Sequence, residues 1–448
     1  MKVPRRKLPW RALGNSTGTR SFSLSRPTWL IKDVEQLSDR IHPVYQETHP
    51  SDLLSLRWPS PPNNVLLVKK DYSPTVTASL VEFAKHITTS YPSVSIVLEA
   101  PVASEVHQDL PVPIYTKVAK DGPPNAFHRK IDMTATFGGD GTILHASSLF
   151  ASAANVPPIL SFSMGTLGFL GEWRFQEYKR AFREVYMSGA GPGDRSRTLE
   201  GGGGSSDARG FDKGTSAVTD GSGLTGWSSI RGKSMGLTRG ARVLLRNRLK
   251  VGIFDASGRR ISGDDDDAAA PAEGDVHAMN EVILHRGKDP HLAVVEVYVG
   301  GRFLTEAVGD GMIISTPTGS TAYSLSSGGS IIHPLVSSLL LTPICPRSLS
   351  FRPLVLPSNT PITLRLSEKN RGREVEVSID GRRRSQSINV GTEVRVWGEE
   401  IRSPEGTWRG GVPCVLRGAV GSEANGDDGW VGGLNGLLKF NFPFGEEG

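Results

Sequence analysis

A strand, a glycine turn and a helix follow one another directly, and this order constrains the fold more than any other feature of the sequence. Residues 131–137 are rich in β-formers, Gly138-Gly139-Asp140-Gly141 breaks the run, and a helical stretch follows from Thr142 to about Ala154. The same order begins again at residues 159–163 and the turn at Gly165. Strands that alternate with helices through short glycine turns are typical of open, mostly parallel sheets. The sequence therefore predicts a Rossmann-like α/β domain.

Two further segments extend this pattern toward the N-terminus. Residues 65–68 are strand-like, and Ser73-Pro74 then starts a helix. The apolar positions of this helix recur at three and four residues: Val76, Leu80, Phe83 and Ile87. Residues 94–98 are strand-like again. We predict that the α/β domain covers residues 60–188, in a chain whose 448 residues are enough for two domains.

The remainder predicts a flexible connection and a second domain of a different class. Residues 189–240 are rich in Gly and Ser without apolar periodicity, as expected of a linker or insertion. Residues 241–423 contain short β-rich runs between glycine turns, which predict an all-β domain. An acidic patch at 264–270 interrupts it and is interpreted as a loop insertion. We treat residues 424–448 as a C-terminal tail.

The basic charge of the chain is concentrated at its N-terminus. The net charge is +5, but residues 1–32 hold eight Lys or Arg, no Asp or Glu, and seven Ser or Thr between Ser16 and Thr28. The rest of the chain has 43 basic against 46 acidic residues, which removes the electrostatic case for nucleic acid binding. The N-terminal composition is typical of an organellar transit peptide, and Arg20–Ser25 resembles a matrix processing site. We expect import into the mitochondrial matrix; a basic tail without a role is the alternative.

Other protein classes are excluded by what the sequence lacks. No run of about 18 apolar residues occurs, so we expect neither a transmembrane helix nor a membrane partner. Cys345 and Cys414 are the only cysteines, which leaves no disulfide framework and no cysteine-based zinc site. With no His/Cys cluster either, we expect no metal held by the protein itself.

Two apparent phosphate motifs are rejected on their context. Gly221–Gly226 has the G-x-G-x-x-G spacing, but it lies in the linker with no strand before it and no helix after it. Gly232-Lys233-Ser234 resembles the end of a P-loop, yet Trp227 stands where the first glycine is required.

The turn at Gly138–Gly141 is the strongest candidate for chemistry. It lies between a strand end and a helix start, where free backbone N–H groups attract phosphate, so Gly138, Gly139, Gly141 and Thr142 are candidate phosphate-binding residues. Asp140 has little steric shielding among its glycine neighbours and is suited to act as a general base toward a substrate hydroxyl. His145, one helical turn later, is a candidate contact to a diphosphate. An ordinary tight turn is the alternative reading.

Three more segments are suited to a nucleotide. Phe169, in the turn after residues 159–163, is placed to lie against a flat base, with plain core packing as its alternative. Asn280-Glu281 pairs an amide that can read an adenine edge with a carboxylate that can bind a ribose diol. The densest polar run covers Gly309-Asp310-Gly311 and residues 316–326, where a helix cap followed by a loop is the simpler explanation.

Taken together and in this order, the three motifs resemble those of the NAD kinase family, most closely its fungal mitochondrial NADH kinase branch. The resemblance covers about residues 60–188 and 240–420 and implies ATP-dependent phosphorylation of the 2′-hydroxyl on the adenosine ribose of NAD or NADH. It implies that Asp140 is the general base and that Gly141 lies at the diphosphate. Phosphoryl transfer mainly requires alignment, proton removal and charge neutralisation, which one carboxylate and Mg²⁺ carried by ATP can supply.

The resemblance also assigns substrate contacts. Phe169 matches an adenine-facing aromatic, and Asn280 and Glu281 match the pair that binds adenine and the ribose hydroxyls. The nucleoside pocket is matched by Thr321, Ala322, Tyr323 and Ser326. Asp310 matches a carboxylate near the nicotinamide end that related enzymes contribute across a subunit contact, so a homo-oligomer is implied. Two alternatives remain open: a lipid kinase that shares the glycine-aspartate turn, and a catalytically silent dinucleotide-binding protein.

Overall fold

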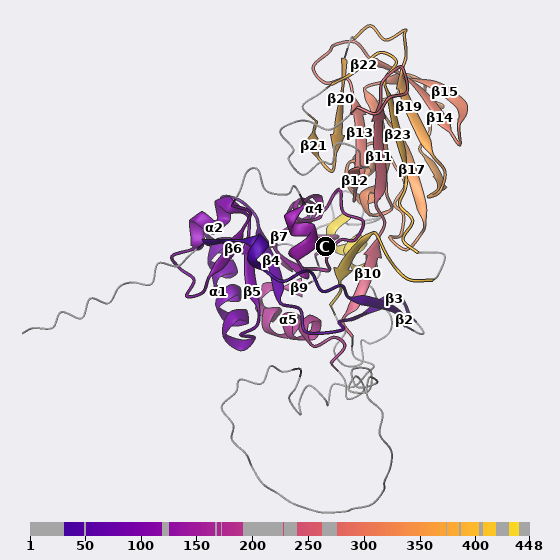
Figure 1. Ribbon diagram of the computed structural model, residues 1–448. Helices are drawn as coiled ribbons and strands as arrows, with labels where there is room; N and C mark the ends of the chain where they lie inside the picture. The colour runs from indigo at the N-terminus through magenta and orange to yellow at the C-terminus, as the bar shows by residue number, and fades with distance from the viewer. Residues whose placement is uncertain are drawn as a thin grey trace, which may run out of the picture.

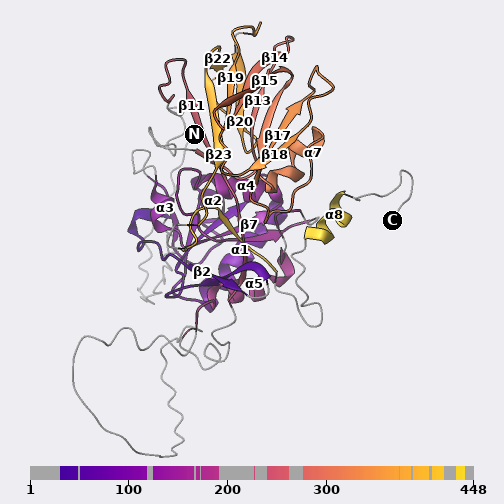
Figure 2. The same cartoon turned by 90° about the vertical axis from the view of Figure 1, so that its right-hand side faces the viewer.

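One mixed sheet and two antiparallel sheets make up the computed structural model of the chain (Figure 1). It describes residues 31–48, 51–118, 125–165, 168–171, 173–190, 227, 240–261, 276–372, 374–384, 387–402, 406–417 and 430–438. The β-rich part stands on the α/β part in both views, with helix α4 (Asp140–Ser148) at the junction (Figures 1 and 2). This arrangement confirms the predicted fold of an α/β unit joined to an all-β unit.

The mixed sheet has the strand order β1-β6-β5-β4-β7-β8-β24-β10-β3-β2, with β9 paired to β8. Its strands are β1 (Ile31–Asp33), β2 (Val44–Thr48), β3 (Ser51–Arg57), β4 (Asn64–Lys69), β5 (Ser95–Leu98), β6 (Ile114–Thr116), β7 (Met133–Gly138), β8 (Ile159–Ser163), β9 (Trp173–Arg174), β10 (Arg242–Arg246) and β24 (Val412–Val415). Neighbours from β1 to β24 run parallel, and β10, β3 and β2 continue the sheet antiparallel.

Helices cover both faces of this sheet. They are α1 (Pro74–Ser90), α2 (Ala100–Val106), α3 (Ala126–Lys130), α4 and α5 (Tyr178–Tyr186), with 3₁₀ turns at Val34–Gln36 and Phe175–Glu177. Alternate residues of β4 point to opposite faces, so Val65 packs in the core with Phe83 of α1, whereas Leu66 packs in the core with Ile143 of α4. The four predicted apolar positions of α1 are all buried, which confirms the reading of that helix. Burial on both faces explains why the four central residues of β4 are all apolar.

The β-rich unit packs its two sheets around a separate apolar core. One sheet has the order β12-β11-β23-β19-β14-β15, and the other β18-β17-β16-β13-β20-β21 with β22 beside β20. The bounds are β11 (Leu249–Phe254), β12 (Val276–Ala278), β13 (Glu281–His285), β14 (Ala293–Val299), β15 (Arg302–Gly309), β16 (Gly311–Ser315), β17 (Ser338–Ile344), β18 (Leu354–Pro357), β19 (Ile362–Leu366), β20 (Glu374–Ile379), β21 (Arg382–Arg383), β22 (Ile388–Asn389) and β23 (Glu393–Gly398). A 3₁₀ turn η4 (Thr318–Thr321) and a short helix α7 (Tyr323–Ser326) follow β16.

The boundary between the two units differs from the predicted division at residues 60–188 and 241–423. Strands β1 to β3 precede residue 60 and still belong to the mixed sheet, and β10 and β24 join it from within 241–423. The chain thus enters the β-rich unit after β10 and returns through β24. Composition does not reveal this crossing, because a short β-rich run looks the same whichever sheet it pairs with.

The predicted appendages lie largely outside the described residues. Of the predicted transit segment 1–32, only Ile31 and Lys32 are described, in β1. The linker is described at its ends and at Trp227, whose indole N–H donates to the Tyr186 carbonyl at 2.7 Å, and the acidic patch 264–270 is not described. Part of the segment predicted as a tail forms helix α8 (Trp430–Leu438). No described helix is long and apolar enough to cross a membrane.

Candidate active site

Asp140 lies at the first position of α4, directly after the carboxyl end of β7. Its carboxylate is half-buried and accepts two backbone hydrogen bonds from the second glycine turn, Oδ2 from Phe169 N–H at 3.0 Å and Oδ1 from Leu170 N–H at 3.1 Å. A Cβ built on Gly168 would approach Asp140 Oδ1 to 2.0 Å, so only glycine allows this contact. The two glycine turns predicted from the sequence therefore meet at one carboxylate, each oxygen of which keeps a lone pair for a further partner.

The glycines of the first turn have two different functions in the structure. Gly138 is required by packing, because a Cβ there would lie 2.2 Å from Thr142 Oγ1. Gly139 and Gly141 face open space, with nothing within 4 Å of an added Cβ. Thr142 is buried, and its N–H bonds the Gly139 carbonyl at 2.9 Å. Within this turn, a ligand can therefore approach the backbone at Gly139 and at Gly141, the two residues that flank Asp140.

Asn280 and Glu281 lie at the start of β13, and the loop after β16 packs directly on them. Thr316 N–H donates to the Asn280 carbonyl at 2.9 Å, and a Cβ on Gly319 would come within 2.2 Å of that same oxygen. Both side chains are 6% exposed, and within the described chain Asn280 Oδ1 and Glu281 Oε2 have no hydrogen-bond partner. A buried polar atom without a partner is costly, so these two atoms mark a place where a polar ligand would be stabilised.

Burial and a neighbouring carboxylate hold Glu281 in an unusual state. Burial, followed by the negative charge of Asp380, raises the pKa of Glu281 to about 8. Burial also raises the pKa of Asp380 to about 6, although backbone N–H groups of Met279, Asn280 and Glu281 act in the opposite direction. Near neutral pH, therefore, Glu281 is mostly protonated and Asp380 mostly ionised.

His145 bridges the two units rather than facing open space. Its Nε2 lies 3.0 Å from both carboxylate oxygens of Glu99, which follows β5, and its Nδ1 accepts from the guanidinium of Arg382 in β21. Both ring nitrogens are thus engaged. The contact of His145 with a diphosphate stays a prediction, and the exposed cation beside the ring is Arg382.

Phe169 is held from two sides, by Arg246 of β10 and by α8. Its carbonyl accepts from Arg246 at 3.2 Å, and the same guanidinium reaches Thr318 Oγ1 at 3.4 Å. Its half-buried ring lies against α8, where a Cβ on Gly433 would be 3.3 Å from Phe169 Cε1. Trp430 of α8 makes an edge contact with His333, with ring centroids 4.7 Å apart. Figure 2 shows α8 on the side of the molecule that carries α7.

These contacts close a circuit around the junction of the two units. From Asp140 it passes through the Phe169 backbone, Arg246 and Thr318 to the loop on Asn280, and it returns through Asp380, Arg382 and His145 to α4. The remaining predicted pocket residues lie on the same loop. Thr321 Oγ1 bonds the Thr318 carbonyl at 3.2 Å, Ala322 is half-buried, and Tyr323 and Ser326 are exposed.

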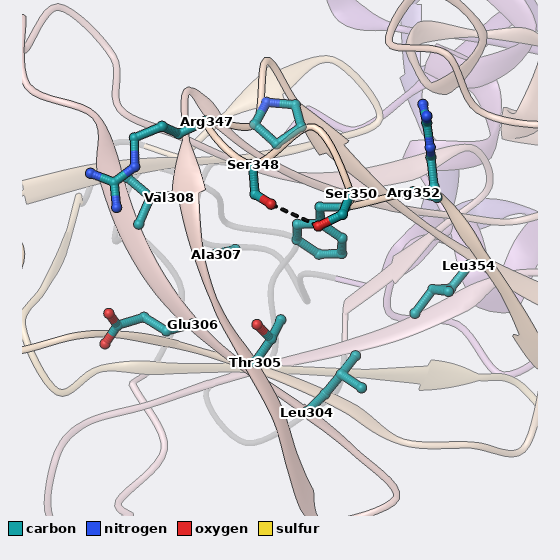
Figure 3. A pocket seen from close by; sticks show the side chains of 12 residues that line it. Leu304, Thr305, Glu306, Ala307, Val308, Arg347, Ser348, Ser350, Arg352 and Leu354 are labelled. Atoms are coloured by element: carbon teal, nitrogen blue, oxygen red, sulfur yellow. Dashed lines mark hydrogen bonds between the residues drawn. The ribbon is translucent and has the colours of Figure 1, made fainter.

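Asp310 is the predicted site residue that the fold sets apart. Glu281 pairs with Ser315 at one end of the β13–β16 ladder, whereas Asp310 directly precedes β16 at the other end, where His285 pairs with Gly311. Its carboxylate bonds Arg286 Nε at 2.6 Å, and its N–H donates to the Ile344 carbonyl. A cavity of about 380 Å³ lies nearby, between β15 and residues 346–354, and includes the bonded pair Ser348 and Ser350 (Figure 3). Within one chain, Asp310 does not join the circuit.

A buried ion pair fixes the end of α4 that faces away from Asp140. Arg248 is 1% exposed and makes two bonds to Glu399, at 2.8 and 2.6 Å, while donating to the Phe150 and Ala153 carbonyls. His277 adds N–H donation to the Ala151 carbonyl, and burial, followed by the charge of Arg248, lowers its pKa to about 4. Helix α4 ends at Ser148, earlier than the predicted end near Ala154. The backbone carbonyls that follow it bond to Arg248 and His277 instead of continuing the helix.

Several residues of this site were missed by sequence reasoning. Glu99 follows β5, Arg246 ends β10, and Asp380 and Arg382 lie together at the turn between β20 and β21, so these residues come from three places far apart in the chain. Gly168 was noted only as part of a turn. The one usable signal was Asp380-Gly381 after a β-rich run, which predicts a tight turn but not its partner. In the described part of the chain, no cluster of three His, Cys, Asp or Glu residues could hold a metal ion.

Comparison with known proteins identifies relatives over nearly the whole chain. Residues 65–190 match the ATP-NAD kinase N-terminal domain, and residues 279–400 match the ATP-NAD kinase C-terminal domain. The mitochondrial NADH kinase pos5 of Schizosaccharomyces pombe is 36% identical over 93% of this chain and 87% of its own. The mitochondrial NADH kinase POS5 of Saccharomyces cerevisiae is 33% identical over 92% and 89%. The crystal structure of yeast NADH kinase complexed with NADH is similar to this fold with a TM-score of 0.70 at 34% identity, covering 94% of this chain and 98% of that one.

Proposed function

The chain belongs to the NAD kinase family, and on that premise we propose how its residues carry out ATP-dependent phosphorylation of NAD or NADH. The 2′-hydroxyl oxygen of the adenosine ribose attacks the γ-phosphorus of ATP, and Asp140 accepts the hydroxyl proton. The bond from the γ-phosphorus to the β,γ-bridging oxygen breaks, which gives ADP and NADP or NADPH. The observation that carries this assignment is the fixed Asp140 carboxylate with open glycine backbone on either side.

We assign the remaining contacts of the proposed site from the charges of the side chains and from the polar atoms that have no hydrogen-bond partner within the described chain. The Asn280 amide and the Glu281 carboxyl, each with an unpartnered oxygen, bind the adenine edge and the ribose hydroxyls. Phe169 and the loop carrying Thr321, Ala322, Tyr323 and Ser326 border the nucleoside. Gly139 and Gly141 border the phosphates, and Arg382, held by His145, supplies a cation to them.

ATP is the phosphoryl donor named by the family, and we propose that Mg²⁺ arrives on its phosphates. Among the described residues, neither Asp140 nor His145 belongs to a cluster of three His, Cys, Asp or Glu side chains that could hold a metal ion. Magnesium commonly binds through one or two carboxylates plus substrate phosphates, so a separate protein cage is not required.

We propose that Asp310 contributes to the binding site of a second subunit. It is remote from the rest of the site within one chain, and exposed apolar side chains surround its side of the β-rich unit: Phe303 at 59%, Leu304 at 45%, Leu349 at 87% and Val355 at 52% exposed. We propose a homo-oligomer in which this surface is covered by another copy and Asp310 reaches the nicotinamide end of the partner's dinucleotide. Sedimentation of the purified protein should give more than one chain per particle; a monomer at micromolar concentration would contradict this assembly.

The compartment is proposed from the N-terminal composition and the relatives. The two yeast relatives are named as mitochondrial, and residues 1–32 have the composition of a transit peptide. The enzyme would then supply NADPH within the matrix. A fluorescent fusion of residues 1–32 should enter mitochondria; a cytosolic fusion would contradict this part of the proposal.

The activity is tested directly with protein lacking residues 1–32, Mg-ATP, and NAD or NADH in parallel, with NADP and NADPH quantified by enzymatic cycling. Faster product from NADH would identify an NADH kinase, and faster product from NAD a general NAD kinase. Asp140→Asn should lower kcat by about 10²-fold or more while the dinucleotide still binds. Full activity of that variant would disprove the general-base assignment, and phosphorylation of a sphingoid base or diacylglycerol instead would favour the lipid-kinase alternative.

A further inference from the structure

The turn between β20 and β21 places an aspartate against the dinucleotide-binding pair. Asp380 has φ of 48°, in the left-handed region, and is followed by Gly381 with φ of 75°. Since β20 pairs with β13 and Ile379 lies opposite Val282, this turn directs Asp380 at the residues that precede Val282. Asn and Asp tolerate this backbone conformation better than other side chains with a Cβ, which fits the residue found here.

The Asp380 carboxylate receives three consecutive backbone N–H groups. Oδ2 accepts from Met279 at 2.7 Å, and Oδ1 accepts from Asn280 at 2.7 Å and Glu281 at 3.2 Å. The Asp380 N–H in turn donates to the Glu281 carbonyl at 3.0 Å. Three successive N–H groups that converge on one side chain cannot belong to a regular strand, so the path of the backbone at Asn280 depends on this acceptor.

The other side of the same segment is fixed by the loop after β16. Thr316 Oγ1 donates to the Met279 carbonyl at 2.7 Å, and Gly319 lies directly over the Asn280 carbonyl. Asn280 and Glu281 are thus held between Asp380 and this loop, while their side-chain oxygens stay unpartnered. Loss of the acceptor would leave buried N–H groups unsatisfied and free the segment to move.

We infer that Asp380 is a positioning residue for dinucleotide binding: it holds the Met279–Glu281 backbone so that the side chains of Asn280 and Glu281 face the adenosine. The inference rests on the proposed function of that pair. Asp140 is held independently, by Phe169 and Leu170, so the effect of Asp380 falls on binding rather than on the chemical step. Asp380 itself contacts only the protein.

The test is Asp380→Asn, which keeps the shape but replaces one accepting oxygen with an amide. NADH affinity is measured without ATP, by fluorescence titration, and kcat and KM are measured with Mg-ATP. We expect the Kd and KM for NADH to rise by about tenfold or more, with kcat within about threefold of the wild-type value. Should this variant not fold, Asp380→Glu, which keeps the charge but misplaces the oxygens, is expected to give the same split.

A matched control is available in the other unit. Asp132 also accepts three backbone N–H groups, from Ile41, Asn63 and Asn64 at 2.6 to 2.8 Å, but it precedes the N-terminal end of β7, whereas Asp140 follows the carboxyl end. Asp132→Asn should lower the melting temperature and leave the Kd for NADH unchanged. An equal rise of Kd in both variants, or a folded Asp380→Asn protein with wild-type Kd and KM, would overturn the inference.

A double-mutant cycle with Asn280→Ala adds an independent readout. If Asp380 acts through Asn280 and Glu281, the effects of Asp380→Asn and Asn280→Ala on the Kd should be clearly less than additive. Full additivity would overturn the positioning function. The binding measurement needs no turnover, so a wild-type protein that binds NADH but forms no product would refute the proposed kinase activity while leaving the function of Asp380 testable.

Discussion

Gly168 lies so close to the Asp140 carboxylate that residue 168 has no room for a side chain. A Cβ on Gly168 would lie 2.0 Å from Oδ1 and 2.5 Å from Cγ of Asp140. The contact lets the next two backbone N–H groups, of Phe169 and Leu170, reach the carboxylate. The second glycine turn therefore fixes the side chain of Asp140 in the first turn. The proposed general base is positioned by a segment almost thirty residues later in the chain.

Gly168→Ala should lower kcat strongly with little loss of stability. The added methyl group must displace either the Asp140 carboxylate or the turn, and misplacement of a reacting group by about 1 Å can cost on the order of 10²-fold in rate. Gly171→Ala is the matched control, since its Cβ would meet Ile143 Cδ1 at an ordinary 3.4 Å. Steady-state kinetics with NADH and ATP decide between them; equal kcat values for the two variants would show that the contact has no catalytic importance.

Gly141→Ala should weaken ligand binding without weakening the fold. Within the protein, the added methyl group meets nothing within 4 Å, and alanine is favoured over glycine inside a helix by about 0.5–1 kcal/mol. We expect an unchanged or slightly raised melting temperature and a KM increased about tenfold for ATP, for the dinucleotide or for both. The control is Gly436→Ala, also helical and also without neighbours within 4 Å. A wild-type KM for both substrates would place the ligands elsewhere.

Glu281→Gln should stabilise the protein at alkaline pH. The pKa of Glu281 is raised from 4.5 to about 8 in the folded state, so the folded protein retains a proton that the unfolded chain releases. Wild-type stability therefore falls as the pH rises from about 4.5 to about 8, by up to a few kcal/mol. Thermal melts should show the variant above wild type at pH 8 and equal to it near pH 4. A constant difference at all pH values would contradict this explanation.

Glu399→Gln should destabilise the junction of the two units. It leaves the Arg248 guanidinium, 1% exposed, without its counter-charge, and breaking a buried pair costs about 3–5 kcal/mol. Burial alone would raise the pKa of Glu399, but hydrogen bonds and charge from Arg248 outweigh it and lower that pKa below 4.5. The contribution is therefore present above about pH 4.5 and lost as the pH falls, so the gap between wild type and variant should narrow in acid. Urea unfolding at pH 7 and at pH 3.5 would measure it, and a gap that widened in acid would contradict the assignment.

The extent to which the fold was predictable differs between its parts. The α1 helix was read correctly because Val76, Leu80, Phe83 and Ile87 follow the helical period, and one-sided burial enforces that period. The placement of β10 and β24 was not predictable. Strand pairing is made by backbone hydrogen bonds that every residue offers, so the partner of a short strand is decided by the rest of the fold.

The residues of the candidate site also differ in how far local sequence patterns could identify them. Asp140 and its glycines were found because strand, turn and helix are adjacent in sequence and the chemistry of a strand end is local. His145 was proposed from its spacing after Gly141, whereas its contacts with Glu99 and Arg382 join distant segments and could not be read from that spacing. For Asp380, the Asp380-Gly381 pair indicates a tight turn but not the partner of the carboxylate, because the backbone groups that it binds lie about a hundred residues earlier.

The sequence by itself determined the class of the two units and the family, and it supplied the residues proposed to carry the chemistry. These features depend on periodicity and short motifs, which a linear chain displays directly. Tertiary structure alone decided that Gly168 and Asp140 touch, that Asp380 holds Asn280 and Glu281, and that Asp310 lies apart. Such contacts join distant segments, and their geometry is set by which strands pair and how the two units pack, which no local pattern records.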